Sequence, residues 1–230
     1  MASILLLACS EEKKGNLHIV GEVKGLKKGE LFLQKIENQK YVNLDSVLFE
    51  GQGSFEFFTN IEEPEVLYLY LVKDDGIEIN DRLEFFAEPG EMKINSTRLY
   101  FVSEAKVEGS KSHDKLMEYR KMMSKFSNRN LELLKGQLEA QKAGNVAKAD
   151  SLGILAEKNQ TRSYLYTLNF ALTNKDSRVS PYITLVEANN AKFKFLDTIN
   201  NSLTEDVANS KYGKALKEYI LLAKRADLGM

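Results

Sequence analysis

The spacing of apolar residues changes near Gly109, and this change constrains the fold more than any other feature of the sequence. Before it, apolar and polar residues alternate over short segments, as in residues 17–23 and 67–71. After it, apolar residues recur at three- and four-residue steps, as in residues 116–126. A period of two is typical of strands and one near 3.6 of helices. The sequence therefore predicts an α+β fold, in which an antiparallel β-sandwich-like domain precedes an all-α helical domain.

A chain of 230 residues is long for one small domain and suits two units. We place the β domain over residues 16–109 and the helical domain over residues 110–230, after a short tether of residues 1–15. Several helix starts have side-chain signals: Ser110 or Ser112 can cap the first helix, Asn145 the second and Thr204 a later short one. Ser180 before Pro181 predicts the start of a third helix.

Two tyrosines of the β half are candidate ligand contacts. Tyr68 and Tyr70 alternate with Leu67, Leu69 and Leu71, so the tyrosines lie on the strand face opposite the leucines. Aromatic side chains of this kind bind sugars or peptides, although packing in a core is the commoner role. Both interpretations remain open at this stage.

The composition argues against several classes of function. The chain has 32 Lys and Arg against 33 Asp and Glu, so no overall charge attracts it to nucleic acid. One Cys excludes an intrachain disulfide, a Cys-x-x-Cys pair and a multi-cysteine zinc site, and two His argue against a histidine metal centre. We therefore predict no nucleic-acid partner, no metal and no cofactor.

No group of residues predicts catalysis. Ser112, His113 and Asp114 have the residue types of a hydrolase triad, but consecutive positions at a helix start point in different directions. The acidic residues at 74–81 lack the order of a calcium-binding loop, and Asp and Gly there are typical of a turn. We assign no catalytic residue and predict that the chain is not an enzyme.

The only cysteine ends the short apolar run at the N-terminus. Leu6, Leu7 and Ala8 precede Cys9, which resembles the bacterial lipobox, where the cysteine is lipidated and becomes the new N-terminus. A basic segment and a full apolar stretch are missing before it, so we interpret the start as a truncated signal. Several acyl chains on Cys9 would hold the protein at a membrane. A free, buried cysteine is the alternative.

Several short phrases occur together in an order typical of one protein family. In the β half they are GLKKGELFL at 25–33, DSV at 45–47, GSFEF at 53–57, FFAEPG at 85–90 and VEGS at 107–110. In the helical half they are KDS at 175–177, SPY at 180–182 and NSKYGKAL at 209–216. The chain thus resembles the uncharacterised N-terminal domain and middle helical region of Bacteroidetes-type envelope lipoproteins that carry a thioredoxin-like thiol-disulfide oxidoreductase domain.

The resemblance implies a membrane-anchored location in the cell envelope, such as the periplasm or outer membrane, at the periplasmic face or the cell surface, rather than an activity. In that family a Trp-Cys-x-x-Cys motif follows the helical region, whereas this sequence has no Trp and no second Cys. We predict a non-catalytic lipoprotein that acts as a binding or spacing module, with an envelope protein or other envelope component as partner. Two alternatives remain: a fragment or degenerate member of a thiol-disulfide oxidoreductase, and a glycan- or peptide-binding domain that uses Tyr68 and Tyr70.

Overall fold

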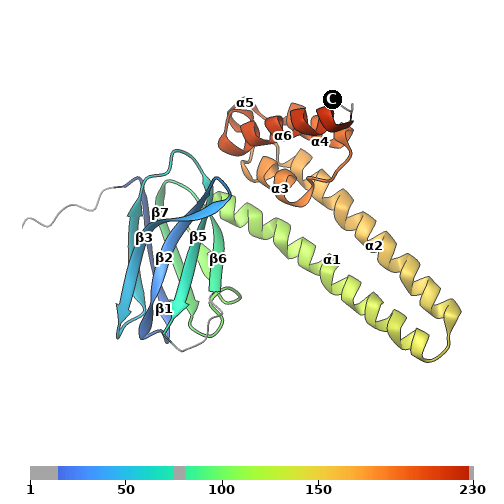
Figure 1. Ribbon diagram of the computed structural model, residues 1–230, viewed down its shortest axis with the longest axis horizontal. Coiled ribbons are helices and arrows are strands. Elements are labelled where there is room, and N and C mark those ends of the chain that lie inside the picture. The colour runs from blue at the N-terminus through green and yellow to red at the C-terminus, as the bar shows by residue number, and fades with distance from the viewer. Residues whose placement is uncertain (1–14, 75–80, 228–230) are drawn as a thin grey trace, which may run out of the picture. The chain divides into compact units, whose positions relative to one another are not determined.

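The computed structural model describes residues 15–74 and 81–227, without the side chains of residues 225–227. The described residues divide into two compact units, with the boundary between Ser110 and Lys111. Strands form the first unit and helices the second, which confirms the predicted α+β class (Figure 1).

The described strands of the first unit form two four-stranded sheets, in the orders β4-β1-β7-β8 and β3-β2-β5-β6. Their bounds are β1 (Leu17–Lys24), β2 (Lys28–Glu37), β3 (Lys40–Glu50), β4 (Ser54–Thr59), β5 (Glu65–Lys73), β6 (Asp81–Ala87), β7 (Gly90–Thr97) and β8 (Lys106–Glu108).

All described strand pairs but one are antiparallel. β1 and β7 run parallel, with Leu17 opposite Gly90 and Lys24 opposite Thr97, so this pair is the exception in two sheets that are otherwise antiparallel, as predicted. The physical reason is that a tight turn forces two joined strands to be antiparallel, whereas strands distant in the chain are free of that constraint. β1 and β7 are separated by strands of both sheets.

The core of the first unit lies between the two sheets. Leu67, Leu69 and Leu71 of β5 are fully buried there, which confirms that Tyr68 and Tyr70 lie on the opposite face of the strand. Other large side chains in this core share the same near-complete burial. They are Leu17, Ile19, Leu31, Leu33, Phe57, Phe85, Met92 and Phe101.

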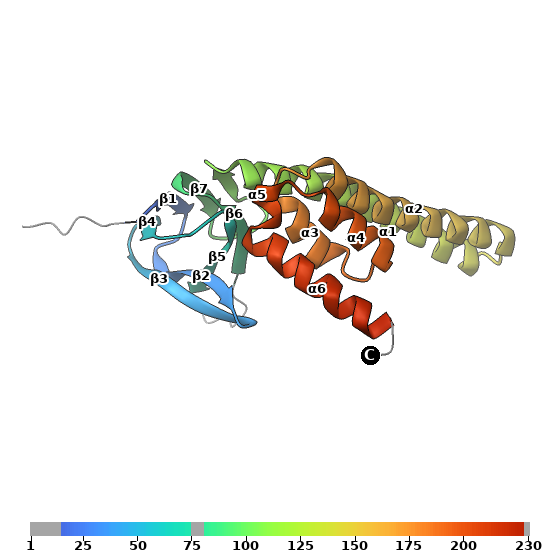
Figure 2. The same cartoon turned by 90° about the horizontal axis from the view of Figure 1, so that it is seen from above.

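The second unit begins with a long antiparallel helical hairpin, seen side by side in Figures 1 and 2. Shorter helices form a cluster with the C-terminal part of α2 around buried Leu168, Leu196 and Leu216. In the described part of the chain, we find no helix with the length and apolar character needed to span a membrane. The helices are α1 (Lys111–Lys142), α2 (Val146–Thr173), α3 (Val179–Glu187), α4 (Phe193–Ser202), α5 (Glu205–Ala208) and α6 (Lys211–Asp227).

The predicted helix cap at Asn145 is confirmed, and the predicted helix start at Ser180 is wrong. The Asn145 side chain accepts a hydrogen bond from the backbone N–H of Lys148 at 3.0 Å and caps α2. Helix α3 already begins at Val179, so Ser180 lies inside its first turn. The Ser180 hydroxyl instead donates to the carbonyl of Ala171 at 2.8 Å, because the residue is fully buried against α2.

Candidate functional site on the outer face of one sheet

The β3-β2-β5-β6 sheet has an outer face, formed by the side chains that alternate with its core residues. The strand register places these side chains in rows across the sheet, which brings residues from four strands together. The rows are Leu48, Glu30 and Val72; then Ser46, Phe32, Tyr70 and Arg82; then Asn43, Gln34, Tyr68 and Glu84; then Tyr41 and Ile36.

Arg82 lies between two tyrosine rings on this outer face. Its guanidinium carbon is 3.8 Å from the ring centroid of Tyr41 and 4.4 Å from that of Tyr70. The Tyr68 ring meets the Tyr41 ring edge-on, with centroids 5.2 Å apart. A guanidinium is attracted to the face of an aromatic ring, by about 0.5–2 kcal/mol per contact depending on exposure. The two rings therefore fix the position of the guanidinium over the sheet.

Two amide side chains, those of Gln34 and Asn43, fix the orientation of the Arg82 guanidinium. The Nε–H of Arg82 donates to Oε1 of Gln34 at 3.2 Å, and Nε2 of Gln34 donates to Oδ1 of Asn43 at 2.7 Å. Gln34 is buried, so its amide needs both hydrogen bonds. Arg82 is thus held by a hydrogen bond as well as by its contacts with two rings.

The remaining N–H groups of Arg82 have no carboxylate partner among the residues that the structure describes. Arg82 forms no ion pair there, and the neighbouring Asp81 pairs with Lys73 instead. A guanidinium presents five N–H donors in a planar fork that matches a carboxylate or a phosphate. The outer face therefore offers a positioned group for recognition of an anion.

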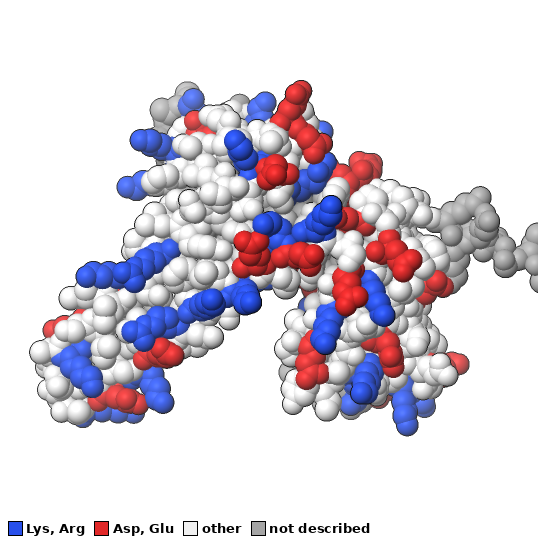
Figure 3. Space-filling view, turned by 180° about the vertical axis from the view of Figure 1, so that it is seen from behind, with Lys and Arg blue, Asp and Glu red and all other residues white. Residues whose placement is uncertain are grey.

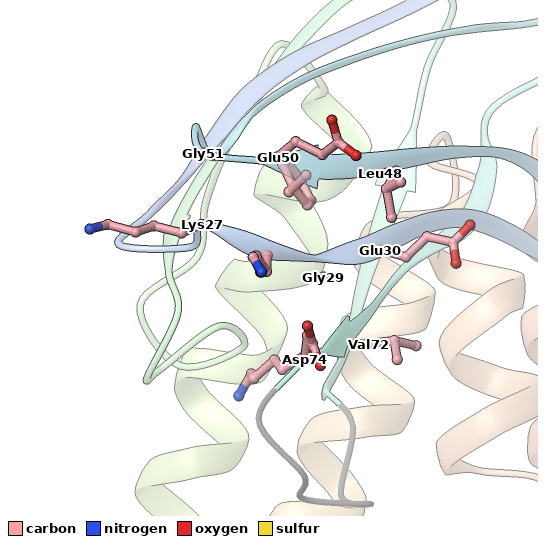
Figure 4. Close-up of a pocket in the computed structure, with 11 residues that line it drawn as sticks. Lys27, Gly29, Glu30, Leu48, Glu50, Gly51, Val72 and Asp74 are labelled. Carbon is pink, nitrogen blue, oxygen red and sulfur yellow. The ribbon is translucent and has the colours of Figure 1, made fainter.

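A pocket of about 730 Å³ lies on the same outer face, beside the first row (Figure 4). Its apolar wall comes from Val72 on β5 and from Leu48 on β3, which is 66% exposed. Gly29 lets β2 pass close to β5, because a Cβ at this position would lie 2.6 Å from the carbonyl oxygen of Val72. The other lining residues are Lys27, Lys28, Glu30, Phe49, Glu50, Gly51, Lys73 and Asp74.

The two tyrosines singled out in the sequence both lie on this outer face. Sequence reasoning missed Tyr41, Arg82 and Gln34, which complete the cluster. Alternation along each strand places these residues on an outer face, but only the pairing of four strands brings them together. The predicted lipidation residue Cys9 lies outside the described residues.

The other sequence candidates do not form a site. Ser112 and His113 are buried in the first turn of α1, whereas Asp114 is exposed, so the three do not form a nucleophile-base-acid chain. Of the acidic segment, Asp75 and Glu78 lie outside the described residues. Over residues 15–74 and 81–227, no three His, Cys, Asp or Glu side chains are grouped to hold a metal ion.

The first unit is thus a β-sandwich that carries a preformed aromatic and guanidinium cluster on the outer face of one sheet. Residues 17–116 match the model of a protein family described as "Domain of unknown function (DUF4369)", and the match spans the β unit and the start of α1. No curated protein and no solved structure matches the chain.

Proposed function

We propose that the protein is a non-catalytic binding module of the cell envelope, which holds a partner on the outer face of the β3-β2-β5-β6 sheet. The observation that carries this proposal is the position of Arg82 between Tyr41 and Tyr70. Rigid aromatic and guanidinium groups are enriched where proteins bind ligands, because little conformational entropy is lost when they make contacts.

The chemistry of the outer face suits binding better than catalysis. Its polar groups are a guanidinium, amides, phenols, carboxylates and the hydroxyl of Ser46. A hydroxyl nucleophile needs an adjacent base. Both histidines of the chain lie elsewhere: His18 on β1 is hydrogen-bonded to Glu56 at 2.8 Å, and His113 is buried in α1. Among the described residues, the Ser46 hydroxyl is hydrogen-bonded to no carboxylate or other base, so the outer face offers contacts to a ligand without an activated nucleophile.

The proposed location rests on Cys9. The lipobox-like segment before it and the resemblance to envelope lipoproteins support lipidation of its sulfur. Such an anchor keeps the binding unit close to a membrane without a transmembrane helix. The partner is then a protein or another component of the same envelope.

Binding is tested with the purified chain on peptide and glycan arrays. We expect retention of at least one ligand class, and loss of most of that retention in Tyr41→Ala and Tyr70→Ala variants. Tyr100→Ala is the matched control, because Tyr100 belongs to the same unit, is 58% exposed and lies outside this outer face. No retention on either array, or equal retention by all three variants, would contradict the proposal.

The anchor is tested separately in the native cells. We expect a labelled fatty-acid precursor to be incorporated into the wild-type chain and not into a Cys9→Ala variant. Unmodified Cys9 in the native protein would remove the envelope tether from the proposal while leaving the binding face to its own test.

The second candidate is a part of a thiol-disulfide oxidoreductase, and the sequence phrases shared with that class favour it. A dithiol exchange needs an attacking and a resolving thiol, and this sequence has one Cys. We expect a thiol reductant to reduce insulin disulfides at the same rate with and without the purified chain. A coding sequence that continues in frame past Met230 into a Cys-x-x-Cys motif would favour the second candidate.

A further inference from the structure

The free edge of the Arg82 guanidinium and the pocket beside Leu48 lie on one outer face, and together they specify a ligand. We propose that this face binds an extended peptide segment in which an apolar side chain and a carboxylate lie four residues apart. The inference rests on the proposed binding function and names its ligand class.

The carboxylate is the group that Arg82 lacks. Its guanidinium is held by Tyr41, Tyr70 and Gln34, yet no carboxylate pairs with it in the described part of the chain. Because the guanidinium is already fixed, a ligand carboxylate gains two charge-assisted hydrogen bonds without ordering a flexible side chain. Lysine would substitute only in part, because an ammonium group carries the charge but lacks the planar pair of donors.

The surrounding charge limits the ligand to one carboxylate near this point. Glu84 lies two residues from Arg82 on the same face of β6, and Glu30 lies in the pocket row. The β unit as a whole carries 20 Asp and Glu against 12 Lys and Arg. A polyacidic ligand would be repelled by these carboxylates, whereas a mainly apolar segment with one Glu pairs with Arg82 alone.

The spacing follows from the strand geometry. The row of Leu48, Glu30 and Val72 lies beside the pocket, and Glu30 is its residue on β2. The Arg82 guanidinium is hydrogen-bonded to Gln34, four residues further along the same strand. Four residues of an extended chain span about 13 Å and return the side chain to the same face. A peptide that runs along the strands therefore places residue i in the pocket and residue i+4, or i−4, at Arg82.

The sheet edge favours a peptide over a glycan. β3 is an edge strand of 11 residues in the described sheet and pairs only with β2. Unpaired backbone groups of such a strand can bind an extended chain by main-chain hydrogen bonds. The neighbouring pocket is walled by Leu48 and Val72, which suit an aliphatic or aromatic side chain better than a hydroxylated sugar.

The probe is a set of octapeptides with blocked termini that carry one Leu and one Glu. We expect peptides with the two residues at i and i+4 to bind the full chain at least about tenfold more tightly than the same peptides with Gln in place of Glu. Peptides with an i, i+3 spacing present the two side chains on opposite faces and should bind as weakly as the Gln set.

Variants of Arg82 assign the preference to this residue. Arg82→Met should abolish the preference for Glu over Gln while binding of the Gln peptide stays unchanged, and Arg82→Lys should retain only part of the preference. Lys93→Met is the control, because Lys93 is an exposed cation on β7 in the other sheet. Thermal unfolding of each variant shows whether the fold is retained, and the paired peptides compare affinities within one protein sample.

Each result separates this inference from the proposed function. Peptide binding with equal affinity for Glu and Gln, or a preference that survives Arg82→Met, overturns the carboxylate assignment and leaves the binding module in place. Binding of uronic-acid glycans with no peptide bound overturns the peptide assignment in the same way. Absence of any ligand on this face overturns both.

Discussion

The β-sandwich and the far end of the α1–α2 hairpin bury their apolar residues in different ways. Phe57 and Phe85 are fully buried between two sheets. In the hairpin, Leu133, Ala140 and Ala149 are buried, but many neighbouring apolar residues are exposed. The exposed ones are Leu131, at 62%, and Leu134, Leu138, Ile154 and Leu155. The sandwich is therefore stabilised mainly by buried area, and the hairpin by close contact of small residues and by helix propensity.

The two units also differ in charge. The β unit has 12 Lys and Arg against 20 Asp and Glu, whereas the helical unit has 20 against 13. Figure 3 shows Lys and Arg side chains along the hairpin, in agreement with the eight basic and four acidic residues of α1. The near-zero charge of the whole chain thus conceals two units of opposite sign, and each unit needs its own electrostatic argument.

The largest loss of unfolding free energy is expected when a large side chain is removed from the core of the sandwich. Phe57→Ala should lower the free energy of unfolding by about 3–5 kcal/mol, because it leaves a cavity between the sheets. Leu134→Ala, at a half-exposed hairpin position, should cost less than about 1 kcal/mol. Urea unfolding measures both, and equal losses would show that the hairpin residue is buried in solution.

A smaller loss is expected where two strands of the sandwich approach closely. A Cβ on Gly21 of β1 would overlap the backbone carbonyl of Ile94 on β7, so Gly21→Ala should cost about 3 kcal/mol. Gly25→Ala is the control, because Gly25 has open space around it and only its φ of 82° opposes a side chain. Its cost should be near 1 kcal/mol, from backbone strain alone. A milder effect at Gly21 than at Gly25 would mean that β1 and β7 are not tightly paired.

The contact between Tyr119 on α1 and Thr167 on α2 should make the free energy of unfolding depend on pH. The hydroxyl groups of Tyr119 and Thr167 share a hydrogen bond of 2.9 Å, in which either can donate, and Oγ1 of Thr167 also lies 3.2 Å from the carbonyl oxygen of Ser163. Burial raises the pKa of Tyr119 to about 12, and this hydrogen bond opposes the rise. Burial also raises the pKa of Tyr166.

The sign follows from which state keeps the proton. Between about pH 10 and 12 the unfolded state loses the Tyr119 proton and the folded state retains it, so stability falls as pH rises through this range. The loss should be on the order of 2 kcal/mol, measured as unfolding free energy against pH. A Tyr119→Phe variant should lack this part of the decline, and an identical decline in the variant would contradict the assignment.

The smallest effect has the opposite sign and lies in the hairpin. Gly153→Ala should stabilise the chain by about 0.5–1 kcal/mol, because alanine favours a helix and its Cβ would meet only the mobile end of Gln137. Hydrogen exchange along α1 and α2 measures the gain. Gly136→Ala is the matched variant, because its Cβ would lie 3.3 Å from Cδ1 of Leu152, against 3.0 Å from Nε2 of Gln137 at position 153, and a gain of similar size is expected. Destabilisation by Gly153→Ala would show that the two helices are packed too closely for a methyl group.

The local pattern predicted most of the fold correctly. The alternation at Leu67, Leu69 and Leu71 identified the buried face of β5, and Asn145 marked the start of α2. The prediction for Ser180 is wrong because a hydroxyl before Pro also serves as a buried donor, and only the packing of α3 on α2 decides between the two roles.

The candidate site was found only in part. Tyr68 and Tyr70 stand out in the sequence because they interrupt a row of leucines. Tyr41 and Arg82 carry no such signal, since their meeting depends on β3 and β6 joining one sheet at a particular register. A shift of one residue in either pairing would move one of them to the other face of the sheet.

The sequence by itself determined the two kinds of secondary structure and the faces that are buried, because hydrophobic periodicity follows the local geometry of strand and helix. The tertiary structure decided the parallel pair β1–β7, the strand order and the contacts of Arg82 with Tyr41 and Tyr70. These depend on pairing between segments distant in the chain, and no local pattern encodes which distant segment a strand will meet.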